Sequence, residues 1–159
     1  MRTLLSTVAA AALVFGLSST AIHAQNHVIQ SPGEVQWGPV PPLLPAGAQI
    51  AVLEGDPGKA VPFTIRLKFP AHYAIPAHSH PTDEHVVVVS GALTFGMGDK
   101  LIHGAATNKT LGVGGVAIMP AHMNHFAFTT ANETTIVLYG QGPVEFKYVN
   151  PADDPRNAK

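Results

Sequence analysis

The 159-residue sequence contains no cysteine, which excludes disulfide bonds and cysteine-based metal sites. Charged residues are scarce at 12%, and the nine lysines and arginines are scattered instead of forming a basic stripe. Because nucleic acid is bound mainly through clustered cations, the composition predicts no nucleic-acid partner. Stability must come from a core built from the 46% of residues that are hydrophobic, and from a metal if one binds.

An apolar run too short to span a bilayer comfortably lies near the N-terminus, where residues 4–17 are rich in alanine and follow Arg2. This pattern predicts a secretory signal peptide over residues 1–24, cleaved after Ala24 or, alternatively, after Ala21. An uncleaved anchor would need a longer apolar stretch. With no twin arginine, we expect the general secretory route, a periplasmic or secreted protein, and no stable membrane anchor after cleavage.

Glycine and proline are frequent, with 15 and 14 residues, and they favour short strands joined by tight turns. We expect a proline-rich arm at 25–47 anchored by Trp37, one β-barrel domain at 48–149 and a loose polar tail at 150–159. About nine short strands are expected in the barrel. The predicted fold class is therefore all-β, a double-sheet jelly roll.

Two strands have informative side-chain patterns. Residues 63–69 alternate strictly, so their apolar members form a core face and leave Arg66 and Lys68 outside, either solvated or as an anchor for a ligand carboxylate. Residues 85–90 are apolar on both faces, which predicts cover from two sides. The cover would be the N-terminal arm or a second subunit, and we expect a homodimer.

Histidine is enriched, with nine residues, and several lie close together in the sequence. His78 and His80 are two residues apart, so on a strand their imidazoles point to the same side and can share one ion. Glu84 adds a carboxylate after a turn, and His125 begins another apolar strand. Three imidazoles and a carboxylate predict one divalent transition metal with open positions for substrate or dioxygen.

The spacing of these residues resembles the two motifs of the cupin superfamily. The first motif is met by His78, His80, Glu84 and Gly91, and the second by Gly114, Pro120 and His125. Three positions depart from the family pattern: His72 and His122 replace turn glycines, and Thr129 replaces an asparagine. None of the three is a metal ligand in the family, so the departures concern loop geometry. Residues 47–56 and 149–156 also resemble a group of small exported bacterial cupins.

The resemblance implies a double-stranded β-helix, the RmlC-like jelly roll, and a metal held by the four motif residues. The ion could be iron, manganese, zinc, copper or nickel, and filling outside the cytoplasm favours copper or zinc. We expect a metal-dependent enzyme of the oxygenase, isomerase or lyase kind, acting on a small oxygen-containing compound. The alternative is a barrel that binds a small ligand or senses metal without catalysis.

Further site residues follow from strand alternation and loop position. Glu84 is a ligand or a proton shuttle, and His122 is either an exposed loop residue or a second acid or base near the metal. His85 should face away from the metal, as a structural or interface residue. The small-molecule pocket is predicted to be mostly apolar. Its expected lining is Val86, Val88, Phe95, Met97, Thr129 and Tyr139.

Overall fold

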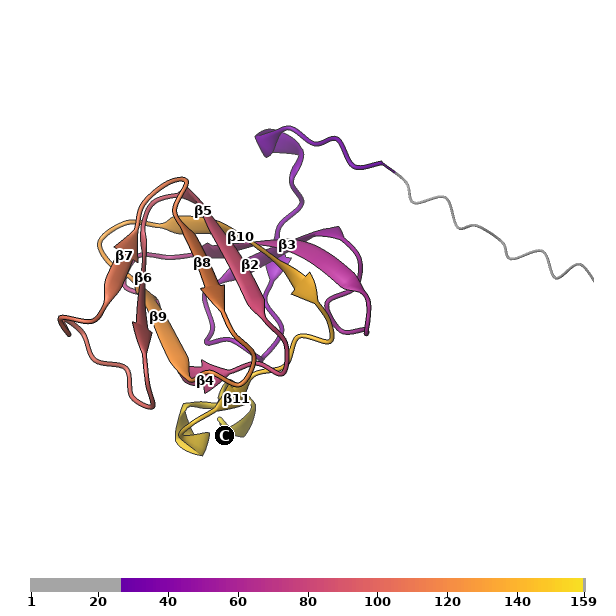
Figure 1. Ribbon diagram of the computed structural model, residues 1–159. Coiled ribbons are helices and arrows are strands. Elements are labelled where there is room, and N and C mark those ends of the chain that lie inside the picture. Colours follow the sequence, from indigo (N-terminus) through magenta and orange to yellow (C-terminus); the bar gives the residue numbers. More distant parts are fainter. Residues whose placement is uncertain (1–26, 159) are drawn as a thin grey trace, which may run out of the picture.

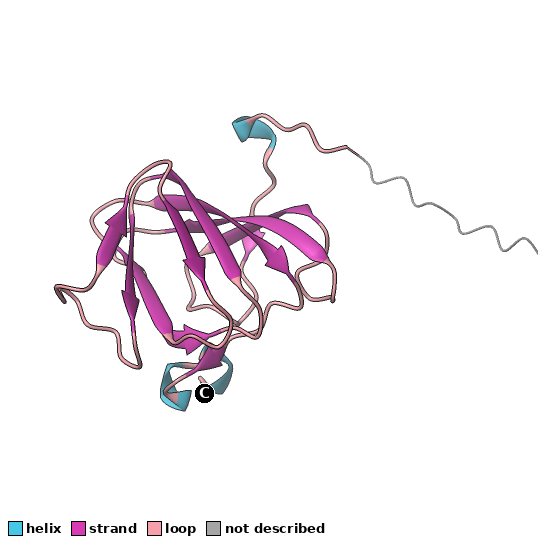
Figure 2. Ribbon diagram, viewed as in Figure 1, coloured by secondary structure: helices cyan, strands magenta, loops and turns pink. Residues whose placement is uncertain are grey.

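The computed structural model describes residues 27–158, which form a β-barrel with a few short 3-10 turns (Figures 1 and 2). The predicted signal peptide and the first two residues of the predicted arm lie outside the described residues. Within the described range, no helix is both long and apolar enough to cross a membrane.

The strands form two antiparallel sheets that face each other. The six-stranded sheet has the order β1 (Gly38–Pro39), β2 (Gln49–Glu54), β3 (Pro62–Phe69), β10 (Thr134–Gln141), β5 (Glu84–Ser90) and β8 (Val116–Met119). The five-stranded sheet has the order β11 (Lys147–Tyr148), β4 (Ala74–Ser79), β9 (His125–Thr129), β6 (Leu93–Met97) and β7 (Lys109–Leu111). Several neighbours in these orders, such as β3 and β10 or β4 and β9, are distant in sequence, as in a jelly roll.

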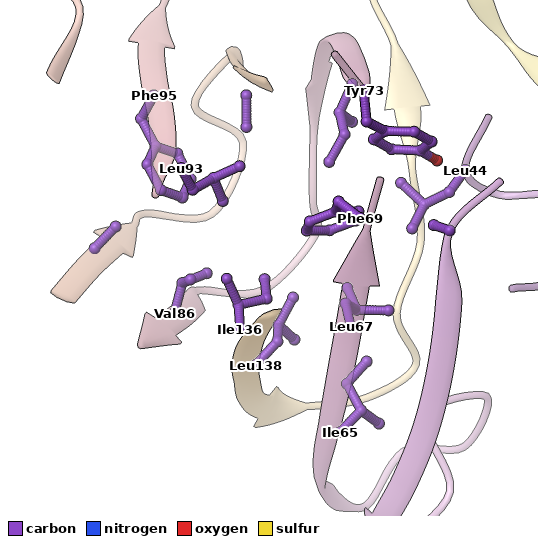
Figure 3. Close-up of a cluster of buried hydrophobic side chains, with 14 of the residues drawn as sticks. Leu44, Ile65, Leu67, Phe69, Tyr73, Val86, Leu93, Phe95, Ile136 and Leu138 are labelled. Carbon is purple, nitrogen blue, oxygen red and sulfur yellow. The ribbon is translucent and has the colours of Figure 1, made fainter. Parts of the chain in front are cut away.

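The core lies between the two sheets and comes from strand alternation (Figure 3). In β3 the burial alternates residue by residue, so Phe63, Ile65, Leu67 and Phe69 all face inward as the sequence predicts. Ile136 and Leu138 of the neighbouring β10 join them. Burying such side chains contributes roughly 1.5–3 kcal/mol each.

The described part of the N-terminal arm is attached to the barrel at several points. It contains the 3-10 turn η1 (Pro32–Glu34), and β1 pairs with β2. Leu44 is buried in the core. Trp37 is half-buried, and Lys68 Nζ lies 4.3 Å from the centre of its ring. Lys68 therefore packs on an aromatic face, a contact that neither sequence interpretation included.

The C-terminal segment differs from the loose tail that we expected. It forms two 3-10 turns, η2 (Pro151–Asp153) and η3 (Pro155–Asn157), beyond β11. Asn150 and Asp154 cap these turns through their side-chain oxygens. Arg156 forms an ion pair with Asp154 at 2.7 Å and donates a hydrogen bond of 2.8 Å to the Phe146 carbonyl. These local bonds hold a polar segment without an apolar core of its own.

The outer face of β5 is not covered by residues 27–47, the described part of the arm. Val89 of β5, and Val116 and Ile118 of the edge strand β8, are 40–56% exposed. Beside them, His85 stacks on Tyr139 of β10 with ring centres 5.0 Å apart. We call the patch of Val87, Val89, Val116, Ile118 and Tyr139 the apolar outer face.

Candidate metal centre

A β-bulge in β4 turns its histidines inward. β4 pairs with β9 through Ile75 opposite Ala127 and then through His78 opposite His125, so the register shifts between the two pairs. The extra residue falls at Pro76–Ala77, where proline, lacking an N–H, is tolerated. Ile75 and His78 therefore both face the barrel interior. His80, two residues beyond His78, returns to the same side.

The other two predicted ligands come from β9, the neighbour of β4, and from β5 of the facing sheet. Glu84 is the first residue of β5, and His125 is the first residue of β9. The carboxylate of Glu84 lies 3.6 Å from His80 Nε2 and 3.4 Å from His125 Nε2. The three histidines offer nitrogen atoms that all lie within 4.8 Å of one another. The structure thus brings all four predicted ligands together.

Backbone carbonyls orient all three imidazoles. The Nδ1 atoms of His78, His80 and His125 lie 2.7, 2.7 and 2.9 Å from the carbonyl oxygens of Pro76, Glu145 and Met123. Each Nδ1 therefore donates its hydrogen to a carbonyl, and each Nε2 keeps its lone pair. This arrangement is the one that metal-binding histidines require, because it fixes both the tautomer and the ring orientation.

Burial sets the charge of these groups. Loss of solvent, together with the nearby His125 and His80, lowers the pKa of His78 to about 3, so its imidazole is neutral. Burial also lowers the pKa of His80. For His125, burial opposes protonation, but contact with the negative Glu84 raises its pKa. Burial acts to raise the pKa of Glu84, yet these histidines lower it, and the carboxylate stays ionised.

The donor set suits a divalent transition metal. His80 Nε2 and His125 Nε2 are fully buried without a hydrogen-bond partner, an arrangement that is costly unless something else satisfies them. An ion of intermediate softness prefers imidazole nitrogen and carboxylate oxygen as ligands. The three histidines can therefore bind a metal, with Glu84 in position to complete the set.

Comparison with known proteins places this site in a recognised fold. No protein-family model and no curated protein matches the sequence. Solved structures do match. The polyketide cyclase RemF from Streptomyces resistomycificus is 15% identical, with 82% of this chain and 90% of that chain covered and a TM-score of 0.63. An RmlC-like cupin from Ralstonia eutropha is 18% identical, with 80% and 75% covered and a TM-score of 0.60. The chain has the cupin fold.

A third cupin-fold match is the DMSP lyase DddQ from Ruegeria pomeroyi. It is 19% identical, 69% of this chain and 57% of that chain are covered, and the TM-score is 0.53. At such identities the likeness establishes the fold and leaves the activity open. The function must therefore be argued from the residues of this barrel.

The cupin barrel contains a very small cavity at the histidines. Its volume is about 20 Å³, and its wall includes His78, Glu84 and His125 together with Val86 and Phe95. A site for one water needs roughly 10–15 Å³, so this space suits an ion or a water-sized ligand. An organic molecule cannot occupy it unless side chains move.

The structure corrects several predicted pocket residues. Val86 and Phe95 line the cavity as expected, whereas Val88 packs in the core away from it. Thr129 is buried, but its hydroxyl bonds to the Pro70 carbonyl at the other end of the barrel. Met97 is 46% exposed at the end of β6, and Tyr139 is 41% exposed on the outer face. Met97 does not line the cavity because β6 ends at this residue. Tyr139 does not line it because its side chain points to the outer face of β10.

Phe146 is a site residue that the sequence did not reveal. Its ring stacks on His78 with centres 4.7 Å apart and meets His80 edge-on at 4.6 Å. The preceding residue, Glu145, supplies the carbonyl that orients His80. Both lie in a segment that reads as an ordinary strand, but only Lys147–Tyr148 forms β11. The hydrogen bond between His80 and the Glu145 carbonyl joins residues 65 positions apart, so no local sequence pattern indicates it.

His122 lies beside the site on the loop between β8 and β9. It is exposed, and with His80, Glu145 and Lys147 it lines a mouth pocket of about 270 Å³. Its backbone N–H donates to the His80 carbonyl at 2.8 Å. Its φ is 64°, and His72 has a φ of 57°. Both departures from the cupin glycines thus keep the left-handed backbone that glycine adopts freely, which histidine tolerates better than most residues.

Replacing His122 tests whether its backbone or its side chain matters to the fold. Left-handed backbone costs a non-glycine residue roughly 1–2 kcal/mol, and glycine loses about 0.5–1 kcal/mol in chain entropy. We expect His122→Gly to change the free energy of unfolding by less than about 1 kcal/mol and the β-branched His122→Val to lower it by about 1–2 kcal/mol, measured by urea unfolding. His103→Val, at a residue without positive φ, is the control. A larger loss in His122→Gly would mean that side-chain contacts dominate.

Proposed function

We propose that this cupin barrel holds one divalent transition metal through His78, His80, Glu84 and His125, and that it is a metal-dependent enzyme acting on a small oxygen-containing organic compound. One observation carries the proposal. The three Nδ1–H groups are bound to backbone carbonyls, and within residues 27–158 the buried Nε2 atoms of His80 and His125 face the ionised carboxylate of Glu84 with no hydrogen-bond partner. Such a set is built to coordinate an ion.

The chain's own residues would divide the chemistry between them. A bound metal supplies a Lewis acid that polarises a substrate oxygen. The three imidazoles are held in the neutral-ligand tautomer by their carbonyls and need no reorientation. An oxygen of Glu84 can accept a proton from the substrate, because this carboxylate stays ionised despite its burial. The apolar wall with Val86 and Phe95 excludes bulk water from that transfer.

Enzymes are present among proteins of this fold. RemF is a polyketide cyclase and DddQ is a DMSP lyase, which supports the enzymatic proposal over a barrel that only binds ligand or senses metal. Neither substrate transfers to this chain. Retention of metal without turnover of any oxygen-containing compound would favour the non-catalytic alternative, in which the same four residues bind an ion for sensing.

Elemental analysis of the protein purified from its native compartment tests the metal. We propose export through the general secretory route, so the ion would be acquired outside the cytoplasm, where intrinsic affinity favours copper or zinc. We expect about one ion per chain, as four protein ligands specify. Less than about half an ion per chain would contradict the proposal.

We also propose that two copies of the chain associate through the apolar outer face. Its side chains come from three adjacent strands of one sheet, and none of the five carries a charge at neutral pH, while His85 stacks on Tyr139 beside them. A two-fold axis places such a face against itself, so no like charges are brought together, and twisted sheets pack well face to face. The positive side chains Arg66 and Lys68 lie off the patch, on β3.

A charge placed within this face should separate the copies. Ile118→Lys puts an ammonium group within the proposed contact, where it would be desolvated, and should weaken association at least tenfold, or about 1.4 kcal/mol. Light scattering coupled to size exclusion measures the mass over a concentration series. Ile102→Lys, at an exposed residue in the loop before β7, is the matched control. A monomeric wild-type protein at high concentration would contradict the proposal.

A further inference from the structure

An apolar chamber lies between the N-terminal arm and the inner side of the six-stranded sheet. Its volume is about 270 Å³. Its wall includes Val40, Leu43 and Leu44 of the arm, Ile65 and Leu138 of the sheet, and Phe146. Every residue that lines it is aliphatic, aromatic, proline or glycine. The chamber therefore offers no partner to a charged group and favours a neutral, apolar one.

The chamber adjoins the candidate metal centre. Leu44, Leu67, Leu138 and Phe146 line both the chamber and the small cavity at the histidines. Leu44, Leu67 and Leu138 appear together in the core view (Figure 3). One layer of side chains thus separates the two spaces, and part of that layer is the Phe146 ring stacked on His78. A rotation of these side chains would join the spaces without moving a strand.

The arm that closes the chamber is held by two buried tyrosines. Tyr148 donates from its hydroxyl to the Leu43 carbonyl at 2.7 Å, and Tyr73 donates to the Pro45 carbonyl. Burial raises the pKa of both phenols, so both remain donors at neutral pH. Leu44, between these two bonds, is buried in the core. The arm is therefore a fixed wall of the chamber, and the chamber is a constant feature of the folded chain.

We infer that the apolar chamber binds the ring of a neutral aromatic substrate whose hydroxyl oxygen reaches the metal centre. This inference rests on the proposed function, since the metal would take the oxygen. The size sets the class of ring. A cavity of about 150 Å³ holds benzene, so a chamber of this volume has room for two fused rings. The substrate class is then a phenol or naphthol with no charged group on the ring system.

The chamber is tested by measuring how tightly naphthalene and 2-naphthol bind to the full mature chain, with and without metal. Calorimetry or ligand NMR gives the affinities. Naphthalene should bind both forms alike. 2-Naphthol should bind the metal-loaded form at least tenfold more tightly, because only there can its oxygen coordinate. Val40→Phe fills the chamber from the arm and Val144→Phe fills it from the segment before β11, and each should weaken naphthalene binding at least tenfold. Val113→Phe, on an exposed loop, should leave binding unchanged.

The outcomes separate the chamber from the metal. Failure of naphthalene to bind the folded wild-type chain, or equal binding by the wild type and by both filled variants that fold, overturns the chamber. Equal affinity of 2-naphthol for the loaded and stripped forms overturns its link to the metal. If the chain binds naphthalene in a way that the filled variants abolish, yet holds no metal, the proposed function fails while the chamber stands.

Discussion

His125→Ala is expected to reduce the metal content from about one ion per chain to less than about 0.1. His125 is 1% exposed at the start of β9, and among the described residues its Nε2 and that of His80 are the two buried imidazole nitrogens without a hydrogen-bond partner. Removing it leaves three protein ligands, His78, His80 and Glu84, and takes away the imidazole nearest to the Glu84 carboxylate. Metal content is measured by mass spectrometry after dialysis against a weak chelator.

Two further variants keep this result interpretable. Glu84→Gln preserves the side-chain volume and removes the negative charge, so the chain should fold and bind metal at least about tenfold more weakly. His103→Ala removes an exposed histidine that packs on Phe128 and does not line the cavity at the ligands, and it should leave the metal content unchanged. Retention of a full equivalent of metal by both His125→Ala and Glu84→Gln would contradict the site.

Addition of Zn²⁺ to the metal-free protein is expected to raise its melting temperature by about 10 °C or more. The gain arises because the ion binds the folded site and finds no assembled site in the unfolded chain. A free concentration about a thousand times Kd contributes roughly 4 kcal/mol, and each kcal/mol shifts the melting of a domain of this size by a few degrees. Scanning calorimetry with and without zinc measures the shift.

The same measurement on His125→Ala supplies the control. Without a full ligand set, zinc should shift the melting temperature of this variant by less than about 2 °C. An unchanged wild-type melt would show that the barrel stands without its ion, and that the site contributes nothing to stability. A chelator added to the native protein should reverse the stabilisation.

The core face of β3 and the pairing of His78 with His80 could be predicted because both follow from short-range spacing, whereas Glu84 and His125 joined the set through the spacing that resembles the cupin motifs. The strict alternation at 63–69 fixes which side chains of β3 face inward. The two-residue spacing of His78 and His80 fixes a shared side in the same way. Neither prediction needs the partner strand. The bulge at Pro76 was not predictable, but it lies before His78 and leaves the spacing of the two histidines intact.

The pocket residues were harder to predict than the ligands. They depend on which face of each strand points inward and on which distant side chains occupy the barrel interior. The run around Tyr139 is apolar on both sides, so its sequence does not say which phase of β10 faces inward. Met97 has the inward phase but lies where its strand ends. The size of the cavity depends on how the side chains of Leu44 and Phe146, from distant segments, pack against it. These are long-range packing events with no signal in a local window.

The tail shows a related limit. Its polar composition predicts poor order, yet Asp154 and Arg156 bind each other and Arg156 reaches the Phe146 carbonyl. Short-range capping bonds of this kind order a segment that buries almost no apolar surface. Phe146 also stacks on His78, so η3 is hydrogen-bonded to a residue that contacts the metal centre.

The three carbonyl acceptors also imply an order of assembly. His78 and His125 bond to carbonyls two residues earlier, so each can be oriented as soon as its own strand forms. His80 must wait for Glu145, 65 residues away, on the segment that precedes the final strand. The full ligand set is therefore oriented only after nearly the whole barrel has folded. We expect the ion to bind after the ligand set is complete. The native site, and not the unfolded chain, therefore selects among competing metals.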